Sequence, residues 1–202
     1  MKNKQALYKI GYGLYVLSSR TGEKDNACIV NAVMQVTSSP MRVALAVNKE
    51  NLTHDMIRDS GVFTLSMLTE ETPFDLIRHF GFQSGRQADK FDGTFPAQRG
   101  GNGVMHLDQF VNAWLSCRVV STTDLGTHTL FLADVEDGDV LSDQPSLTYA
   151  YYQAHIKPKA KPERKTGWRC TVCGYIYEGE TLPPDFTCPL CKHGAEDFEK
   201  IE

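Results

Sequence analysis

The chain has 202 residues, of which 41% are hydrophobic and 23% charged, and its formal net charge is −4. That length allows one domain of ordinary size plus a small module. The negative charge argues against nucleic acid as the main partner, and the lack of an apolar run of about 18 residues argues against a membrane span. The N-terminal segment lacks the apolar stretch and cleavage site of a secretory signal. We therefore expect a cytoplasmic protein with reduced cysteines.

The first 156 residues predict a mainly β domain. Short apolar or alternating segments between turn residues are typical of strands, and three stretches favour helices. Many short strands with few helices predict a closed barrel with helical insertions. In chain order, the expected strands are 8–18, 27–36, 41–47, 62–68, 113–121 and 128–135, and the expected helices are 53–60, 73–81 and 147–155.

Common nucleotide and hydrolase motifs are absent from this domain. It has no G-x-G-x-x-G after a strand, no P-loop, no G-x-S-x-G elbow and no H-E-x-x-H. The glycine-rich stretch 99–103 has no helix after it and favours a flexible turn. Cys28 and Cys117 are isolated, and we expect them to be buried small residues.

A basic segment separates this domain from the C-terminal part of the chain. Residues 157–166 contain two prolines, five basic residues and one acidic residue, whereas residues 167–202 contain three basic and seven acidic residues. The first segment is typical of an extended, solvated linker. We therefore expect domains at 1–156 and 167–202, joined by a linker at 157–166. An acidic module on a basic neck suggests docking to more than one surface, although a solubilising spacer explains the charges equally well.

Four cysteines near the C-terminus have the spacing of a metal site. Cys170 and Cys173 form one C-x-x-C pair, and Cys188 and Cys191 form another. Two such turns can direct four sulfurs at one point, and tetrahedral sulfur coordination favours iron or zinc over two strained disulfides. A module of about 35 residues cannot hold a core alone, so the metal must contribute folding energy. Gly174 follows the second cysteine, where a turn often requires a positive φ.

Aromatic residues surround these cysteines in a specific order. The pattern aromatic-x-C-x-x-C-G-Y at 168–175, then C-P-x-C at 188–191 and a Phe at 198, resembles the rubredoxin family. The loop between the pairs is short, as in the rubredoxin domains of rubrerythrins. The resemblance implies one iron ion bound by four cysteines within an apolar shell that tunes its potential. A structural zinc site is the alternative.

An ordered set of short motifs also runs through the first domain. These are 12–19, 26–28, 35–40, 47–53, 60–63, 79–81, 84–85 with 89–91, and 126–131. Together they resemble the flavin reductase-like, FMN-binding split-barrel family, which includes flavoredoxins, over most of residues 5–155. The resemblance implies a homodimeric split β-barrel with one FMN per subunit near the dimer interface.

The resemblance further implies which residues contact the ring and ribityl chain of FMN. Asn26 and Ala27 correspond to a loop whose polar groups face the isoalloxazine. Thr37 and Ser38 occupy the stretch that lines the ring and the ribityl chain. His128 corresponds to a histidine near the flavin, although an exposed strand residue is also a reasonable interpretation.

The phosphate end is expected at the start of the first helix. Asn51 and Thr53 suit the phosphate because Thr53 opens a helix, where backbone N–H groups and the helix dipole favour an anion. Lys90 adds a positive charge for the phosphate or the ring. The alternatives are that Thr53 is only an N-cap and that Lys90 is a solvated charge.

The two modules together predict an electron-transfer protein. Flavins accept two electrons as a hydride and release them singly, whereas a four-sulfur iron centre takes one at a time. This combination resembles the high-molecular-weight rubredoxins, which implies transfer from NADH or NADPH through FMN and iron to a redox protein such as a flavodiiron oxygen or nitric oxide reductase. The alternatives are a pure electron carrier reduced by another protein, and a non-redox binding protein with structural zinc.

Overall fold

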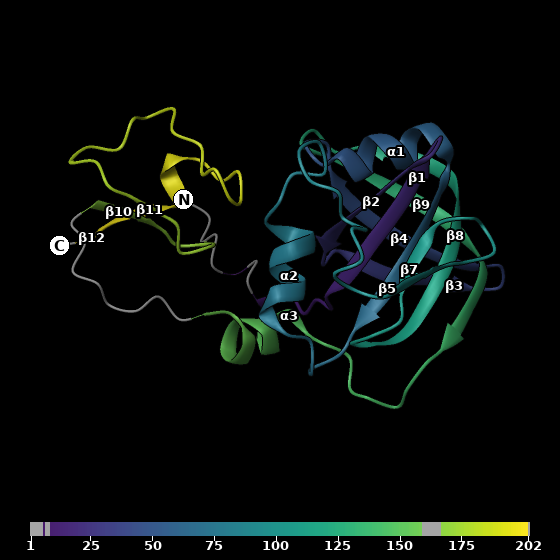
Figure 1. Cartoon of the computed structure of the whole chain (residues 1–202). Coiled ribbons are helices and arrows are strands. Elements are labelled where there is room, and N and C mark those ends of the chain that lie inside the picture. The colour runs from purple at the N-terminus through teal and green to yellow at the C-terminus, as the bar shows by residue number, and fades with distance from the viewer. Residues whose placement is uncertain (1–5, 7–8, 159–166, 202) are drawn as a thin grey trace. The chain divides into compact units, whose positions relative to one another are not determined.

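The computed structural model describes residues 6, 9–158 and 167–201. The chain divides into two compact units, Met1–Lys157 and Pro158–Glu202 (Figure 1). Most of the linker expected at 157–166 lies outside the described residues. Within the described ranges, no helix is long and apolar enough to cross a membrane.

The large unit is built on one antiparallel sheet of seven strands, in the order β2-β1-β5-β8-β9-β4-β3. Its edge strands are therefore β2 and β3, which follow one another in the sequence. The strands are β1 (Tyr15–Thr21), β2 (Lys24–Val30), β3 (Val33–Ser38), β4 (Met41–Asn48), β5 (Val62–Leu68), β8 (Val111–Asp124) and β9 (His128–Val140).

One face of this sheet closes around a shared apolar core. Val30 of β2 and Val43 of β4 belong to the same buried cluster, although four strands separate β2 from β4 in the sheet order. The sheet must therefore be rolled on itself, which confirms the expected barrel-like, mainly β fold. Helix α1 (Leu52–Ser60) contributes Ile57 to this core and ends at Gly61, whose φ of 73° suits glycine.

A second apolar cluster covers the outer face of β1 and β2. Because neighbouring side chains of a strand point to opposite faces, Val16 lies in this cluster while Leu17 lies in the first. Helix α2 (Phe74–Gly81) packs here through Leu76, Ile77 and Phe80. The remaining elements are the hairpin of β6 (Ala97–Arg99) and β7 (Met105–Leu107), the short helix α3 (Tyr149–Tyr151) and the π-helical turn Tyr152–Ile156.

Three strand predictions differ from the structure. The run expected as one strand at 27–36 forms two strands, because the chain turns at residues 31–32 and Val33 N–H donates to the Asn31 carbonyl at 3.0 Å. The strand expected from residue 8 begins at Tyr15. Strand β9 continues through a segment expected to turn, because Gly138 has no side chain to collide with the backbone of β8.

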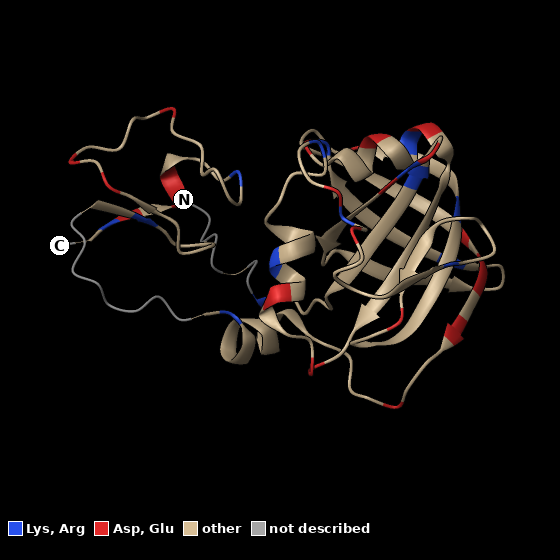
Figure 2. Ribbon diagram, viewed as in Figure 1, with Lys and Arg blue, Asp and Glu red and all other residues tan. Residues whose placement is uncertain are grey.

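The small unit is a three-stranded sheet in the order β11-β10-β12. Its elements are β10 (Gly167–Cys170), β11 (Ile176–Tyr177), a 3₁₀ turn (Ala195–Asp197) and β12 (Phe198–Ile201). Among the described residues, its buried cluster comprises Cys170, Cys188 and Phe198, and partly buried aromatic, aliphatic and cysteine side chains pack against them. Acidic residues lie along its loops and on the 3₁₀ turn (Figure 2).

Candidate metal centre and cofactor site

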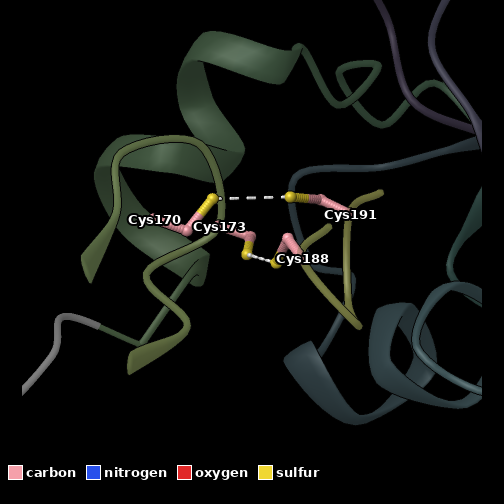
Figure 3. Close-up of side chains that lie close together, drawn as sticks. All are labelled: Cys170, Cys173, Cys188 and Cys191. Carbon is pink, nitrogen blue, oxygen red and sulfur yellow. Dashed lines mark hydrogen bonds between the residues drawn. The ribbon is translucent and has the colours of Figure 1, made fainter. Parts of the chain in front are cut away.

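Four cysteine sulfurs meet in the small unit (Figure 3). All four Sγ atoms lie within 4.8 Å of one another. The Sγ–Sγ distance is 3.5 Å for Cys170–Cys191 and for Cys173–Cys188, far longer than the ~2.05 Å of a disulfide. A tetrahedral ion with metal–sulfur bonds of about 2.3 Å requires sulfur–sulfur distances of about 3.8 Å. The spacing therefore fits one tetrahedral metal ion.

The two C-x-x-C turns position these sulfurs in the same way. Gly174 N–H donates to the Cys170 carbonyl at 2.9 Å, and Lys192 N–H donates to the Cys188 carbonyl at 3.0 Å. Both donor residues have positive φ, 79° at Gly174 and 61° at Lys192. The expectation of a positive φ at Gly174 is thus confirmed, while the equivalent position in the second turn accepts a lysine.

Burial around the sulfurs is uneven. Cys170 and Cys188 are buried, whereas Cys173 and Cys191 are partly exposed. Phe186 closes the buried side, with ring centroids 4.7 Å from Tyr177 and 5.3 Å from Phe198. Burial raises the pKa of the Cys173 thiol to about 11. A cation among the sulfurs would stabilise the thiolates, so this donor set fits a thiophilic metal such as iron or zinc.

A buried polar pair lies in the large unit, where β2 passes the start of α1. Asn26 Nδ2 donates to Thr53 Oγ1 at 2.8 Å, and both side chains are almost fully buried. Asn26 Oδ1 has no hydrogen-bond partner among the residues that the structure describes. Leaving a buried acceptor unsatisfied costs about 1–3 kcal/mol. A ligand hydroxyl, such as those of a ribityl chain, would supply the missing donor, so the pair fits FMN.

Helix α1 begins without a side-chain capping hydrogen bond. Asn51 occupies the N-cap position, but its side chain makes no capping hydrogen bond. Its Nδ2 instead lies 3.7 Å from Cys28 Sγ, whose pKa burial raises to about 11. The first turn of the helix therefore lacks a side-chain acceptor. The His54 N–H donates to the Asn51 carbonyl at 3.0 Å, and the N–H groups before it suit an anion.

The other residues expected near the ring are spread over three strands. Ala27 is buried in the cluster under α2. On β3, Thr37 donates to the Pro40 carbonyl at 2.9 Å, and Ser38 is exposed. His128 Nδ1 lies 2.9 Å from Thr127 Oγ1, and burial together with nearby His54 lowers the pKa of His128. No hydrogen bond within the described ranges joins these residues to Asn26 or Thr53.

Lys90 is buried against α2. Its side chain is almost inaccessible, and its Nζ donates to the carbonyls of His79 at 2.6 Å and Phe80 at 3.2 Å. His79 Nε2 donates in return to the Lys90 carbonyl at 3.0 Å. Burial lowers the pKa of Lys90 to about 8. The ammonium group of Lys90, which was expected near the flavin, is therefore bound to the last turn of α2.

Sequence reasoning missed the segment that covers the Asn26–Thr53 pair, residues 82–91, here called the strap. A Cβ on Gly85 would lie only 2.0 Å from Asn26 Oδ1, so the strap packs directly on Asn26. The next residue, Arg86, pairs with Asp55 in the first turn of α1 at 2.7 Å. The signal in the sequence was the Ser-Gly pair at 84–85, which belonged to the ordered motifs but had no assigned role.

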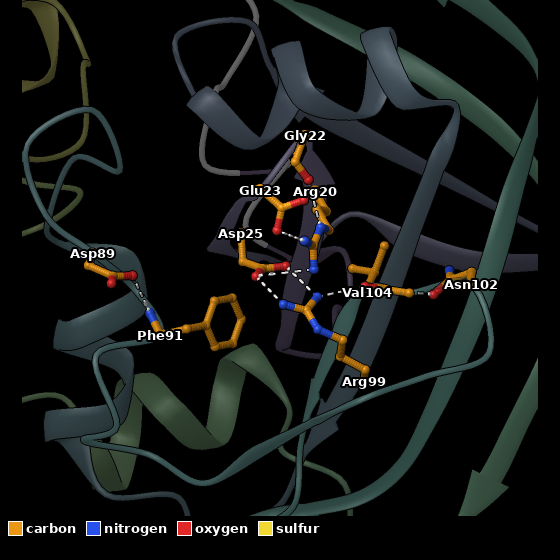
Figure 4. Close-up of polar contacts among 10 residues, drawn as sticks. Arg20, Gly22, Glu23, Asp25, Asp89, Phe91, Arg99, Asn102 and Val104 are labelled. Carbon is orange, nitrogen blue, oxygen red and sulfur yellow. Dashed lines mark hydrogen bonds and ion pairs between the residues drawn. The ribbon is translucent and has the colours of Figure 1, made fainter.

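An open cleft of about 420 Å³ lies beside the strap, between it and the turn that joins β1 to β2. Two of the acidic residues that line it are paired: Asp25 accepts from Arg99 through both carboxylate oxygens at 3.0 and 2.7 Å, and Glu23 accepts from Arg20 at 2.7 Å (Figure 4). The cleft is lined by Glu23, Lys24, Asp25, Gly85, Arg86, Gln87, Ala88, Asp89 and Phe91.

Comparison with known proteins gives two matches along the chain. Residues 7–160 match the flavin reductase like domain, and residues 168–199 match the rubredoxin-like domain of rubrerythrin. A high-molecular-weight rubredoxin of Moorella thermoacetica is 35% identical over 98% of this chain and 99% of its own length. A ferric-chelate reductase (NAD(P)H) of Archaeoglobus fulgidus is 41% identical over 79% of this chain and 93% of its own length.

Solved structures show the same fold for the large unit. A flavoredoxin from Methanosarcina acetivorans is 21% identical, with a TM-score of 0.62 over 69% of this chain and 74% of that chain. The Streptomyces globisporus NADH:FAD oxidoreductase, in complex with NAD and FAD fragments, is also 21% identical, with a TM-score of 0.66 over 79% of this chain and 92% of that chain.

Proposed function

Because this chain belongs to the flavin reductase-like family and carries a C-terminal rubredoxin-like domain, we propose that it is an NAD(P)H-dependent flavo-rubredoxin oxidoreductase. It would take electrons from NADH or NADPH at a bound FMN, transfer them to an iron centre and deliver them to a redox protein. The observation that carries this proposal is the presence, on one chain, of a domain that matches the flavin reductase like family and of four cysteine sulfurs within 4.8 Å of one another.

The cofactors would carry the electrons, and the residues of the chain would hold the cofactors. When bound, a flavin interconverts two-electron and one-electron transfer, and an iron–thiolate centre carries one electron. Cys170, Cys173, Cys188 and Cys191 would hold the iron, with zinc as a substitute of similar fit. No side chain of this chain is required to act as an acid or base in this scheme. The protein binds and orients the groups and shields them from water.

The flavin contacts belong to the same proposal. Asn26 and Thr53 would meet the ribityl and phosphate end, together with Asn51 at the N-cap of α1. Lys90 would act on the flavin indirectly, by fixing the end of the strap to α2. Lining of the ring is assigned to Ala27, Thr37, Ser38 and His128 on the resemblance to the family.

The domain division is also proposed. We assign residues 1–156 to the flavin domain, 157–166 to a linker and 167–202 to the rubredoxin-like domain. The two matched ranges and the two compact units support this division to within a few residues.

We propose a homodimer for the large unit. Its edge strand β3 and the neighbouring β4 carry large apolar side chains that are strongly exposed, namely Met34 at 64%, Val36 at 44% and Met41 at 53%. Several large exposed apolar side chains on one sheet edge favour an interface there. Light scattering of the purified protein tests this, and a monomeric mass would contradict it.

The visible absorption spectrum of anaerobically purified protein tests the electron path. We expect flavin bands together with iron–thiolate charge-transfer bands, and both should bleach on addition of NADH or NADPH. Bands that bleach only with another reduced protein would identify a pure electron carrier. Flavin bands alone, with zinc found by metal analysis, would contradict the proposal.

A cysteine variant separates the two cofactors. Cys173→Ser should abolish electron delivery to a one-electron acceptor such as cytochrome c, while FMN stays bound and is still reduced by the nicotinamide. Cys117→Ala is the matched control, because Cys117 is a buried cysteine of the large unit and is not one of the four clustered cysteines. Undiminished cytochrome c reduction by Cys173→Ser would show that electrons leave from the flavin directly.

A further inference from the structure

Two histidines lie at the start of β9, one on helix α1 and one on the strand itself. We propose that His54 of α1 is a positioning residue, which carries a positive charge next to the start of β9 and thereby keeps His128 uncharged. This inference rests on the proposed function, in which His128 lies near the flavin ring. It deepens that function by naming the residue that controls the charge there.

The side chain of His54 is buried, and both of its ring nitrogens have polar partners. Its Nε2 lies 2.9 Å from Thr129 Oγ1, and its Nδ1 lies 3.1 Å from Asp55 Oδ1. The ring also packs edge-on against Phe131, with ring centroids 5.6 Å apart. These contacts fix the imidazole between the first turn of α1 and the beginning of β9.

The partners of His54 suit a protonated ring. A protonated imidazole donates from both nitrogens, so it needs an acceptor at each of them. The Asp55 carboxylate accepts at one nitrogen, and the Thr129 hydroxyl accepts at the other. The hydrogen bond from Arg86, followed by the one from His54, holds the pKa of Asp55 below its ordinary value, so this carboxylate stays ionised. A buried charge at His54 is therefore both paired and hydrogen-bonded.

His128 is the first residue of β9 and is partly buried. Burial, followed by the charge of His54, lowers the pKa of His128. Lys49 and Asp124 lie on the neighbouring chain segments, but they pair with one another at 2.7 Å, so neither charge offsets the effect of His54. Thr127 Oγ1 lies 2.9 Å from His128 Nδ1 and can donate to it when the ring is neutral.

A charged His54 and a neutral His128 suit the chemistry proposed for the site. Hydride transfer moves two electrons and one proton from the nicotinamide to the flavin, and it leaves the nicotinamide ring positively charged. A protonated His128 next to that ring would oppose the charge that develops in the transition state. A neutral His128 avoids this repulsion, while the charge on His54 stays inside the unit, paired with Asp55.

Histidine NMR of the full, flavin-loaded chain measures the charge of His128 directly. In His54→Gln, which keeps a hydrogen-bonding side chain but carries no charge, we expect the pKa of His128 to rise towards its ordinary value. His106→Gln is the matched control, because His106 is also a buried histidine beside an aspartate, Asp108. This control should leave the titration of His128 unchanged.

Two variants of Thr129 test the same effect without removing the histidine. Thr129→Val takes away the hydroxyl acceptor and keeps a β-branched side chain of similar size. A charged His54 would then have an unsatisfied Nε2–H, so the ring loses its charge and the pKa of His128 should rise as in His54→Gln. Thr129→Ser retains the hydroxyl and should titrate like the unmodified chain. This pair keeps the test valid if His54→Gln folds poorly.

The pH dependence of kcat/KM for NADH or NADPH connects this charge to the reaction. If the reaction requires a neutral His128, kcat/KM falls on the acidic side of the profile as His128 becomes protonated. In His54→Gln and Thr129→Val, this acidic limb should move to higher pH by the same amount as the NMR titration. In Thr129→Ser and His106→Gln it should not move.

Three results would overturn the inference. The first is an unchanged or lowered pKa of His128 in His54→Gln and Thr129→Val. The second is an equal rise in His106→Gln, because the shift would then reflect a general loosening of the unit. The third is a shifted NMR titration with an unmoved acidic limb, which would remove His128 from the flavin site. If the unmodified chain oxidised neither NADH nor NADPH at any pH, the proposed function itself would fail, and the NMR titration would still decide whether His54 controls the charge of His128.

Discussion

The large and small units of this protein are stabilised by different means. The large unit has two apolar clusters, one inside the rolled sheet and one under α2, built from aliphatic and aromatic side chains of many strands. In the small unit, the described buried cluster consists of two cysteines and one phenylalanine, with the other two cysteines packed against it. The residues that bind metal and the residues that form the core are largely the same in that unit.

This difference shows how chain length decides the source of stability. A domain of about 150 residues buries enough apolar surface to offset its conformational entropy, and one of about 40 residues does not. The small unit therefore depends on coordination, for which structural metal sites contribute roughly 10–16 kcal/mol in small domains. The core of the large unit is large enough to tolerate a buried polar atom such as Asn26 Oδ1, which has no hydrogen-bond partner among the described residues.

The strongest test of the contrast removes one ligand of the metal. Cys188→Ser should abolish metal binding and unfold the small unit, because the coordination energy is most of its stability. The melting temperature of the large unit should not change. Metal analysis and calorimetry measure both effects, with Cys117→Ala as the control that keeps the cage intact. A small unit that still melts cooperatively without metal would refute this account.

Truncation of a core side chain should destabilise the large unit and leave the small unit unaffected. Leu45 is fully buried in the rolled sheet, so Leu45→Ala should destabilise the large unit by about 2–5 kcal/mol and leave the metal content unchanged. Leu125→Ala is the matched control, because Leu125 is 54% exposed. Urea denaturation followed by flavin release measures the change. Loss of metal from Leu45→Ala would show that the two units are energetically coupled.

The buried lysine gives the large unit a specific dependence on pH. Burial lowers the pKa of Lys90 from 10.5 to about 8. At a pH between these two values, Lys90 is therefore more protonated in the unfolded chain than in the folded chain. The contribution of Lys90 to the free energy of unfolding should therefore rise from about pH 8 to pH 10.5 and be lost again as the pH falls through 8. The difference in stability between the unmodified chain and Lys90→Met isolates this residue from other groups that titrate at high pH, such as Cys28. A difference that does not vary with pH would mean that Lys90 is solvated.

The smallest effects are expected from surface ion pairs, and these should be equal in the two units. Arg42 pairs with Asp134 across β4 and β9 at 2.6 Å, and Arg169 pairs with Glu199 across β10 and β12. Both pairs are partly exposed, so Arg42→Gln and Arg169→Gln should each change stability by less than about 1 kcal/mol. Thermal melting at low and high salt measures the change. A larger loss in the small unit would show that its sheet, as well as its metal, holds it together.

The small unit was almost fully specified by local sequence. Its four ligands lie in two C-x-x-C turns, and the residue after each pair donates its N–H to the carbonyl four residues earlier. Gly174 could be recognised because glycine adopts a positive φ more readily than any other residue type. The positive φ of Lys192, at the equivalent position of the second turn, could not be recognised, because a residue other than glycine gives no sign of a left-handed conformation in the sequence.

The sequence by itself also determined that the large unit is mainly β, since alternation and turn residues are local properties, and the ordered motifs indicated the flavin reductase-like family. Only the tertiary structure decided that residues 27–36 split into the two edge strands of the sheet. It also decided that Lys90 turns to α2 while Arg86 faces α1, although the two residues are close together in the sequence. The direction of a side chain depends on which distant element packs against it, and residue type and spacing do not encode that choice.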